Sequence, residues 1–123
     1  MNREIKFRAW ICNDDEGCFM AKWNRHVKKA FGTFLARDGN DTAHLMQYTG
    51  LTDKNGREVY EGDIVEDSYV AISENSSEVY FQRGAFWVNY GGAVKLLANR
   101  DMDQIEVVGN KLENPELRND KDT

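Results

Sequence analysis

Glu61 and Asp63 are the two residues whose types and spacing most readily suggest chemistry, because their carboxylates flank Gly62. Two neighbouring carboxylates could share a divalent cation and so support metal-dependent hydrolysis. That reaction also needs further acidic ligands or a base that converge on the same point. We therefore favour a structural interpretation, in which Asp63 accepts hydrogen bonds from the backbone of a turn and Glu61 stays solvated. The hydrolase remains a minor alternative.

The two histidines offer no stronger case for catalysis or for a metal site. His26 and His44 are far apart in the sequence and have no ligand partners at the spacing of a zinc site. The central segment, residues 48–65, also has no nucleophile beside a base and no phosphate-binding glycine loop that opens a helix. We therefore expect no catalytic residue, no metal, no cofactor and no enzymatic activity.

A basic segment, residues 22–37, carries five lysines and arginines and no acid. Its mixture of cations and aromatic rings suits stacking on single-stranded nucleic acid. The residues that would make such contacts are Lys22, Trp23, Arg25, Lys28 and Lys29. The net charge of −5 argues against bulk nucleic-acid binding, and a solvated face with buried aromatics is the commoner explanation. We keep nucleic-acid binding as the second hypothesis.

Cys12 and Cys18 flank an acidic turn. If this turn closes a hairpin, the two cysteines could lie opposite each other at bridging distance. The amino terminus alternates charged with apolar residues and no apolar run approaches membrane-spanning length, so the sequence predicts a cytoplasmic protein without a membrane partner. In a reducing cytoplasm the two cysteines are expected to remain thiols.

The elements that must position these residues centre on one long motif, residues 48–65. Its Asn55-Gly56 dipeptide tolerates two successive positive-φ positions and so predicts a hairpin reversal. Gly62 permits a second tight bend. The residues of the motif that we expect to have structural roles are Tyr48, Gly50, Asn55, Gly56, Tyr60, Gly62 and Asp63.

Short apolar segments separated by turn residues predict strands along the rest of the chain. These are residues 4–10, 18–21, 44–48, 64–72, a hairpin over 78–88 folded at 82–84, 93–98 as a strand or a turn of helix, and 105–108. Residues 23–35 fit a helix or a short strand with a bulge, and the path of residues 22–43 stays open. The pattern predicts a mainly β fold, a small antiparallel barrel or coiled β-sheets with at most one or two short helices. We expect a single domain over residues 1–118 and a loose tail over 119–123.

Seven parts of the chain resemble the YopX family of phage and prophage proteins. They are residues 3–10, 46–51, 53–56, 59–65, 84–86, 105–110 and 113–117, and together they span nearly the whole chain. The chain departs from the usual pattern of this family between Ile11 and Phe34, where both cysteines and most of the basic segment lie. The resemblance implies a mostly β fold encoded by bacteriophages and prophages of Gram-positive bacteria, with self-assembly suspected and no biochemical activity to carry over.

From these features we expect a non-enzymatic interaction or assembly module that forms a homo-oligomer. An amphipathic first strand and an aromatic-rich hairpin offer more apolar surface than one small barrel readily encloses, so some of it would be buried between subunits. A phage or host protein is a further possible partner.

The nucleic-acid hypothesis predicts a salt-dependent mobility shift with single-stranded nucleic acid. Neutralising the cations of the basic segment, as in the double substitution of Lys28→Gln and Lys29→Gln, is expected to abolish this shift because phosphate contacts supply most of the affinity. The absence of any binding by the unaltered protein at low salt would end this hypothesis.

Overall fold

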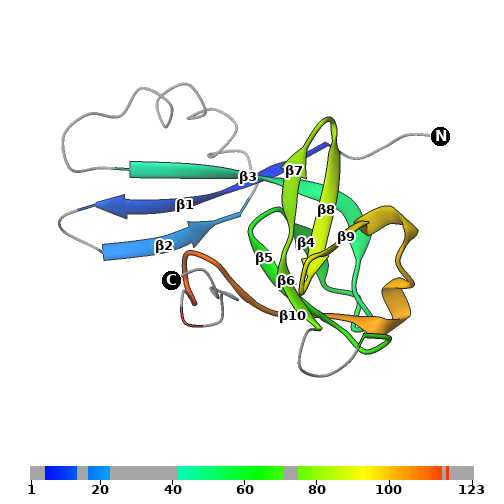
Figure 1. The fold of residues 1–123 in the computed structure, drawn as a ribbon. Helices are drawn as coiled ribbons and strands as arrows, with labels where there is room; N and C mark the ends of the chain where they lie inside the picture. The colour runs from blue at the N-terminus through cyan, green and yellow to red at the C-terminus, as the bar shows by residue number, and fades with distance from the viewer. Residues whose placement is uncertain (1–4, 14–16, 23–41, 71–74, 115, 117–123) are drawn as a thin grey trace. The chain divides into compact units, whose positions relative to one another are not determined.

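The computed structural model describes residues 5–13, 17–22, 42–70, 75–114 and 116 (Figure 1). Nearly all of its regular structure is antiparallel β-strand, so the predicted mainly β fold is confirmed. The chain divides into two compact units, Met1–Tyr48 and Thr49–Thr123, which are described separately here. The extent of the predicted single domain, residues 1–118, stays a prediction.

The first unit contains a sheet built on a central strand. It consists of β1 (Phe7–Asn13), β2 (Gly17–Ala21) and the first part of β3 (Thr42–Thr52). β1 lies between β2 and β3 and pairs with both in the antiparallel sense. The strand predicted over residues 4–10 begins at Phe7, and Ile5 before it is 65% exposed.

Both faces of this sheet carry buried side chains. Ala9 and Ile11 are buried on one face, and Arg8 lies on the other, opposite the buried Met46. Arg8 is one of the charged residues that alternate with apolar ones in this segment, but only 9% of it is exposed. A long arginine side chain can bury its methylene groups against apolar neighbours, so a charged residue in an alternating pattern need not mark the solvent side.

The Asn55-Gly56 reversal is confirmed in position, but its turn type differs from the prediction. Gly56 has φ 81°, whereas Asn55 is not among the described non-glycine residues with positive φ. The amide of Gly56 donates to the carbonyl of Asp53 (3.0 Å), and the amide of Asp53 donates to the carbonyl of Arg57 (2.9 Å). This is the pattern of a type I turn followed by one left-handed residue, which needs glycine only at the last position.

The second unit contains two three-stranded antiparallel sheets in addition to the end of β3 and its partner β4 (Glu58–Tyr60). One sheet has the order β10-β5-β6 and the other the order β7-β8-β9. Their strands are β5 (Asp63–Asp67), β6 (Ser76–Glu78), β7 (Tyr80–Gln82), β8 (Ala85–Tyr90), β9 (Ala93–Leu96) and β10 (Ile105–Asn110). Two 3₁₀ turns, η2 (Leu97–Asn99) and η3 (Met102–Gln104), lie between β9 and β10.

Val79 is the point at which one stretch of chain passes from the first of these sheets to the second. β6 pairs with β5 before it, and β7 pairs with β8 after it. At the corner, Val79 donates to the carbonyl of Asp63 (2.8 Å) and accepts from the amide of Gly62 (2.7 Å). Both sheets therefore enclose one core, formed by Val59, Val65, Val79, Phe86, Val88, Tyr90, Leu97, Ile105 and Val107.

The hairpin predicted over residues 78–88 is confirmed and extends into a third strand. Arg83 and Gly84 both have positive φ and join the pair Gln82 and Ala85, so the two-residue mirror-image turn expected at Asn55-Gly56 occurs here. The predicted strand over residues 64–72 is too long. It ends at Asp67, because the side chain of Asp67 accepts from the amide of Tyr69 and turns the chain.

Candidate functional site

Asp53 holds its own turn and fixes that turn to the last strand. One carboxylate oxygen accepts from the amides of Asn55 and Arg57, both at 2.9 Å. The other accepts from the amide of Val107 in β10, also at 2.9 Å. Asp53 is only 6% exposed, so this carboxylate is solvated chiefly by backbone amides. Its arrangement leaves little room for chemistry on a ligand.

Asp63 has the structural role that was predicted for it. It is fully buried, and its carboxylate accepts from the amide of Tyr60 at 2.8 Å. Gly62, between the two acidic residues, has φ 88° and accepts from the amide of Lys111 at 2.9 Å. Glu61 is half-buried. Among the described residues, no three or more His, Cys, Asp or Glu side chains group closely enough to hold a metal ion.

Asn110 organises the turn that follows β10 in a similar way. Its side-chain oxygen accepts from the amides of Leu112 (2.8 Å) and Glu113 (3.3 Å). The amide of Asn114 donates to the carbonyl of Asn110 (2.7 Å), and the amide of Asn110 donates to the side-chain oxygen of Asn114 (3.2 Å). Asn110 is 2% exposed. Asp53, Asp63 and Asn110 therefore have the same role, since the side chain of each accepts hydrogen bonds from backbone amides.

An ionic cluster that the sequence did not indicate joins β5, β8 and Arg100, the residue that follows η2. Arg100 Nε lies 2.9 Å from Asp67 Oδ2, and Asp67 is fully buried. The Arg100 guanidinium lies 6.0 Å from the centre of the Tyr90 ring. The Tyr90 hydroxyl is buried and makes no hydrogen bond of ordinary geometry. Burial and, to a smaller extent, the negative charge of Asp67 raise the pKa of Tyr90 far above its ordinary value, and Arg100 only partly opposes this shift.

The outer face of the β7-β8-β9 sheet carries four apolar side chains beside polar ones such as the exposed Asn89. We use this name for Tyr80, Trp87, Val94 and Leu96, which lie opposite to the buried side chains of β8. Tyr80, Trp87 and Leu96 form one cross-strand row and are half-buried, whereas Val94 is 54% exposed. On the core side, Phe81 is 47% exposed and contacts the buried Phe86 edge to face. Tyr80 and Trp87 thus share one face of the hairpin, and Phe81 and Phe86 share the other.

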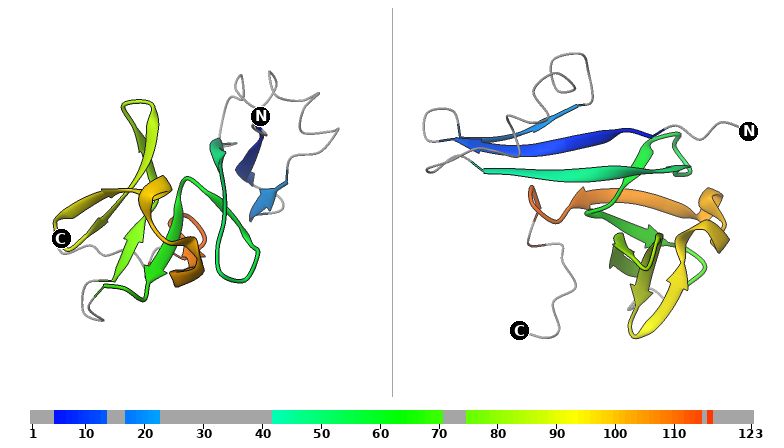
Figure 2. Two further views of the ribbon diagram at one scale, coloured as in Figure 1. Left: turned by 90° about the vertical axis from the view of Figure 1, so that its right-hand side faces the viewer. Right: turned by 90° about the horizontal axis from the view of Figure 1, so that it is seen from above.

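The turn end of β7 and β8 extends away from the rest of the second unit (Figures 1 and 2).

Of the residues predicted to contact nucleic acid, Lys22 is exposed. Trp23, Arg25, Lys28 and Lys29 lie outside the described residues, so this prediction is untested.

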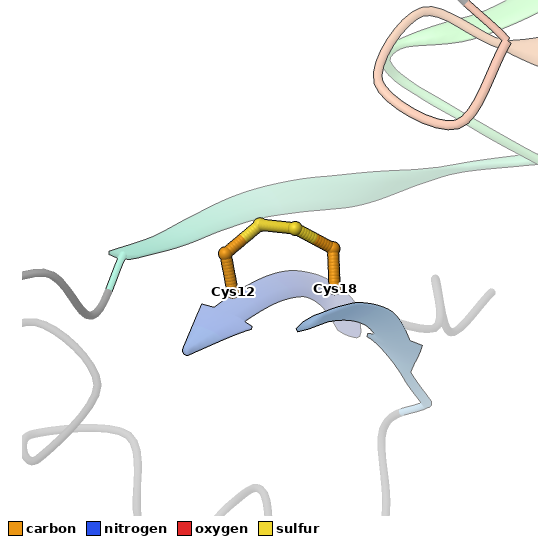
Figure 3. Close-up of a disulfide and its surroundings, with 2 residues drawn as sticks. All are labelled: Cys12 and Cys18. Atoms are coloured by element: carbon orange, nitrogen blue, oxygen red, sulfur yellow. A yellow bond between two sulfur atoms is a disulfide. The ribbon is translucent and has the colours of Figure 1, made fainter. Parts of the chain in front are cut away.

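The expectation that the two cysteines remain thiols is wrong for this structure. Cys12 in β1 and Cys18 in β2 are directly opposite in register, and their sulfur atoms are bonded (Figure 3). The hairpin geometry that was proposed for them is confirmed. The expectation failed because it was based on the inferred compartment and not on the geometry of the pair. Within the described part of the chain, no helix has the length and apolar character needed to cross a membrane.

The described strands define a small, mainly β protein in which the polar residues of the longest motif hold turns and strand ends together. The chain belongs to the YopX protein family, whose model matches residues 6–118. Its structure is similar to the crystal structure of protein EF1440 from Enterococcus faecalis, with 24% sequence identity and a TM-score of 0.56. That comparison covers 94% of this chain and 99% of the other, and it shows the fold alone. No curated protein matches the chain.

Replacing Asp53 with alanine tests the turn network. Three backbone amides lose their acceptor, one of them in β10, so we expect the free energy of unfolding in urea to fall by about 3 kcal/mol. Asp103→Ala is the matched control, because this carboxylate is exposed and its loss should change stability by less than about 0.5 kcal/mol. Equal effects of the two substitutions would contradict the role assigned to Asp53.

The raised pKa of Tyr90 predicts a loss of stability in alkali. Above a pH of about 10 the unfolded tyrosine loses its proton while the folded one keeps it, so the free energy of unfolding falls as pH rises. Tyr90→Phe should flatten this fall in urea unfolding measured between about pH 8 and pH 11. The exposed Tyr69, replaced by phenylalanine, is the control, and a variant of Tyr90 with the same slope as this control would refute the assignment.

Proposed function

We propose that the protein is a non-enzymatic, phage- or prophage-encoded interaction module that assembles with copies of itself. The observation that carries this proposal is the outer face of the β7-β8-β9 sheet, with Val94 exposed on the strand at its edge. Membership of the YopX family is consistent with it. The polar motif residues also support a binding role, because they are occupied with backbone amides and leave surface contacts as the means of action.

The β9 strand has the features of an edge that can pair with another strand. Within the described residues its neighbour in the sheet is β8, on one side. Proteins that avoid pairing at such an edge usually place charged residues outward on it. In β9 the exposed positions are Ala93 and Val94, whereas the one charged residue, Lys95, is half-buried. The edge is short and carries one lysine, which limits pairing, but its two exposed side chains are apolar.

A second copy of the chain would pair with this edge through its own β9 strand. Two β9 strands related by a two-fold axis would pair in the antiparallel sense, and each would supply the same surface to the other. Such pairing would join the two outer faces into one continuous surface that includes Trp87 and Leu96. Strand pairing supplies hydrogen bonds and orientation, and side-chain contacts across the paired β9 strands add a smaller hydrophobic contribution.

Self-association predicts a mass above 14.2 kDa in light scattering at micromolar concentration. Val94→Glu should return the protein to the monomer mass, because a charge placed on an exposed edge strand disfavours pairing with another strand. The circular dichroism spectrum should not change, since Val94 is exposed in the single chain.

Ala98→Glu is the matched control for this experiment. Ala98 is also exposed and apolar, but it lies in the η2 turn outside the sheet, so the same added charge should leave the assembled mass unchanged. A monomer mass for the unaltered protein would overturn the proposed assembly, and loss of assembly in both variants would refute the position assigned to the interface.

A further inference from the structure

The disulfide closes the turn end of the β1–β2 hairpin. Cys12 and Cys18 are opposite partners in the antiparallel register, and their Cα atoms are 4.1 Å apart. Both side chains project to the same side of the hairpin (Figure 3). Among the described strands β2 pairs with β1 alone, whereas β1 is also paired with β3. The bond therefore connects an edge strand to the centre of its sheet.

The two cysteines differ in their accessibility. Cys18 is exposed and belongs to the edge strand, in a run of exposed residues that extends to Phe19. Cys12 is half-buried and lies in the central strand, where it also faces Thr42 of β3 in the register. Thiol–disulfide exchange needs direct approach to one sulfur, so the difference in exposure decides which sulfur is attacked.

We propose that this disulfide is a thiol-responsive site, and that an external thiol attacks Cys18 and releases Cys12. In the first step the incoming thiolate forms a bond to Cys18 Sγ, the bond between the cysteines breaks, and Cys12 leaves as a thiolate that takes up a proton. In the second step another thiolate attacks the mixed disulfide at its external sulfur and releases Cys18. Two low-molecular-weight thiols are thus oxidised to one disulfide, and the protein disulfide is reduced to two thiols.

Reduction changes the part of the sheet that the bond holds. β2 keeps its hydrogen bonds to β1 after the bond breaks, but the covalent closure at the turn is lost. Cross-strand covalent closure limits local opening, and an edge strand has few other contacts to replace it. The reduced protein should therefore open along β2 more often, while β5 in the second unit should not respond.

The first test identifies the attacked sulfur in the full-length protein. The oxidised protein is treated with limiting reduced glutathione, quenched with acid, alkylated and mapped by mass spectrometry. The expected product has glutathione on Cys18 and the alkyl group on Cys12. Glutathione on Cys12 would overturn the proposal. Alkylation of both cysteines before any thiol is added would also overturn it, because no bond would then exist.

Single variants test accessibility without the bond. Cys12→Ser leaves Cys18 as a free thiol and Cys18→Ser leaves Cys12, so each can be reacted with glutathione disulfide. Cys18 should react several-fold faster, and equal or reversed rates would contradict the assignment.

Amide hydrogen exchange then tests the consequence for the hairpin. Excess dithiothreitol should speed exchange in β2 by about tenfold or more and leave β5 unchanged. The double variant with Cys12→Ser and Cys18→Ser should exchange in β2 like the reduced protein, with or without dithiothreitol. Unchanged exchange in β2 on complete reduction would show that the bond does not control this strand.

Discussion

The carboxylate of Asp53 is the interaction on which the second unit most depends. It accepts hydrogen bonds from two amides of its own turn and from one amide of β10, at Val107. A further bond, from the amide of Lys54 to the carbonyl of Ile105, joins the same two segments. The turn after β3 therefore also positions the last strand, β10. The conformation of a local turn is in this way coupled to a contact between residues that are distant in the sequence.

Buried polar groups elsewhere in this unit follow the same rule. Asp63, Asp67 and Asn110 are each at most 2% exposed, and each accepts from at least one backbone amide. A buried carboxylate without partners would be strongly destabilising, so each such group restricts its segment to the conformation that satisfies it. The motif residues of this YopX protein thus specify a set of turns, and the surfaces available for binding lie on the strands between them.

Much of the fold could be predicted from the sequence because its signals are local. Gly56, Gly62 and the Arg83-Gly84 pair mark reversals that depend on backbone conformation a few residues wide. The contacts that could not be predicted join distant residues. The pairing of Arg100 with Asp67 and the burial of Arg8 follow from how strands come together, and alternation along one strand carries no information about either. The disulfide was missed for a different reason, since its geometry was foreseen and its chemistry was judged from the expected compartment.

The passage of a single stretch of chain through Val79 has a consequence for how the second unit responds to load. β6 and β7 are separated only by Val79, and each belongs to a different sheet. The two sheets are therefore joined directly by one continuous segment of backbone. A pull or twist applied to the β7–β8 hairpin cannot be relieved by slippage between layers, as it could where a flexible linker separates them. It is transmitted directly to β5, so the two sheets should resist deformation and unfold together as one mechanical body.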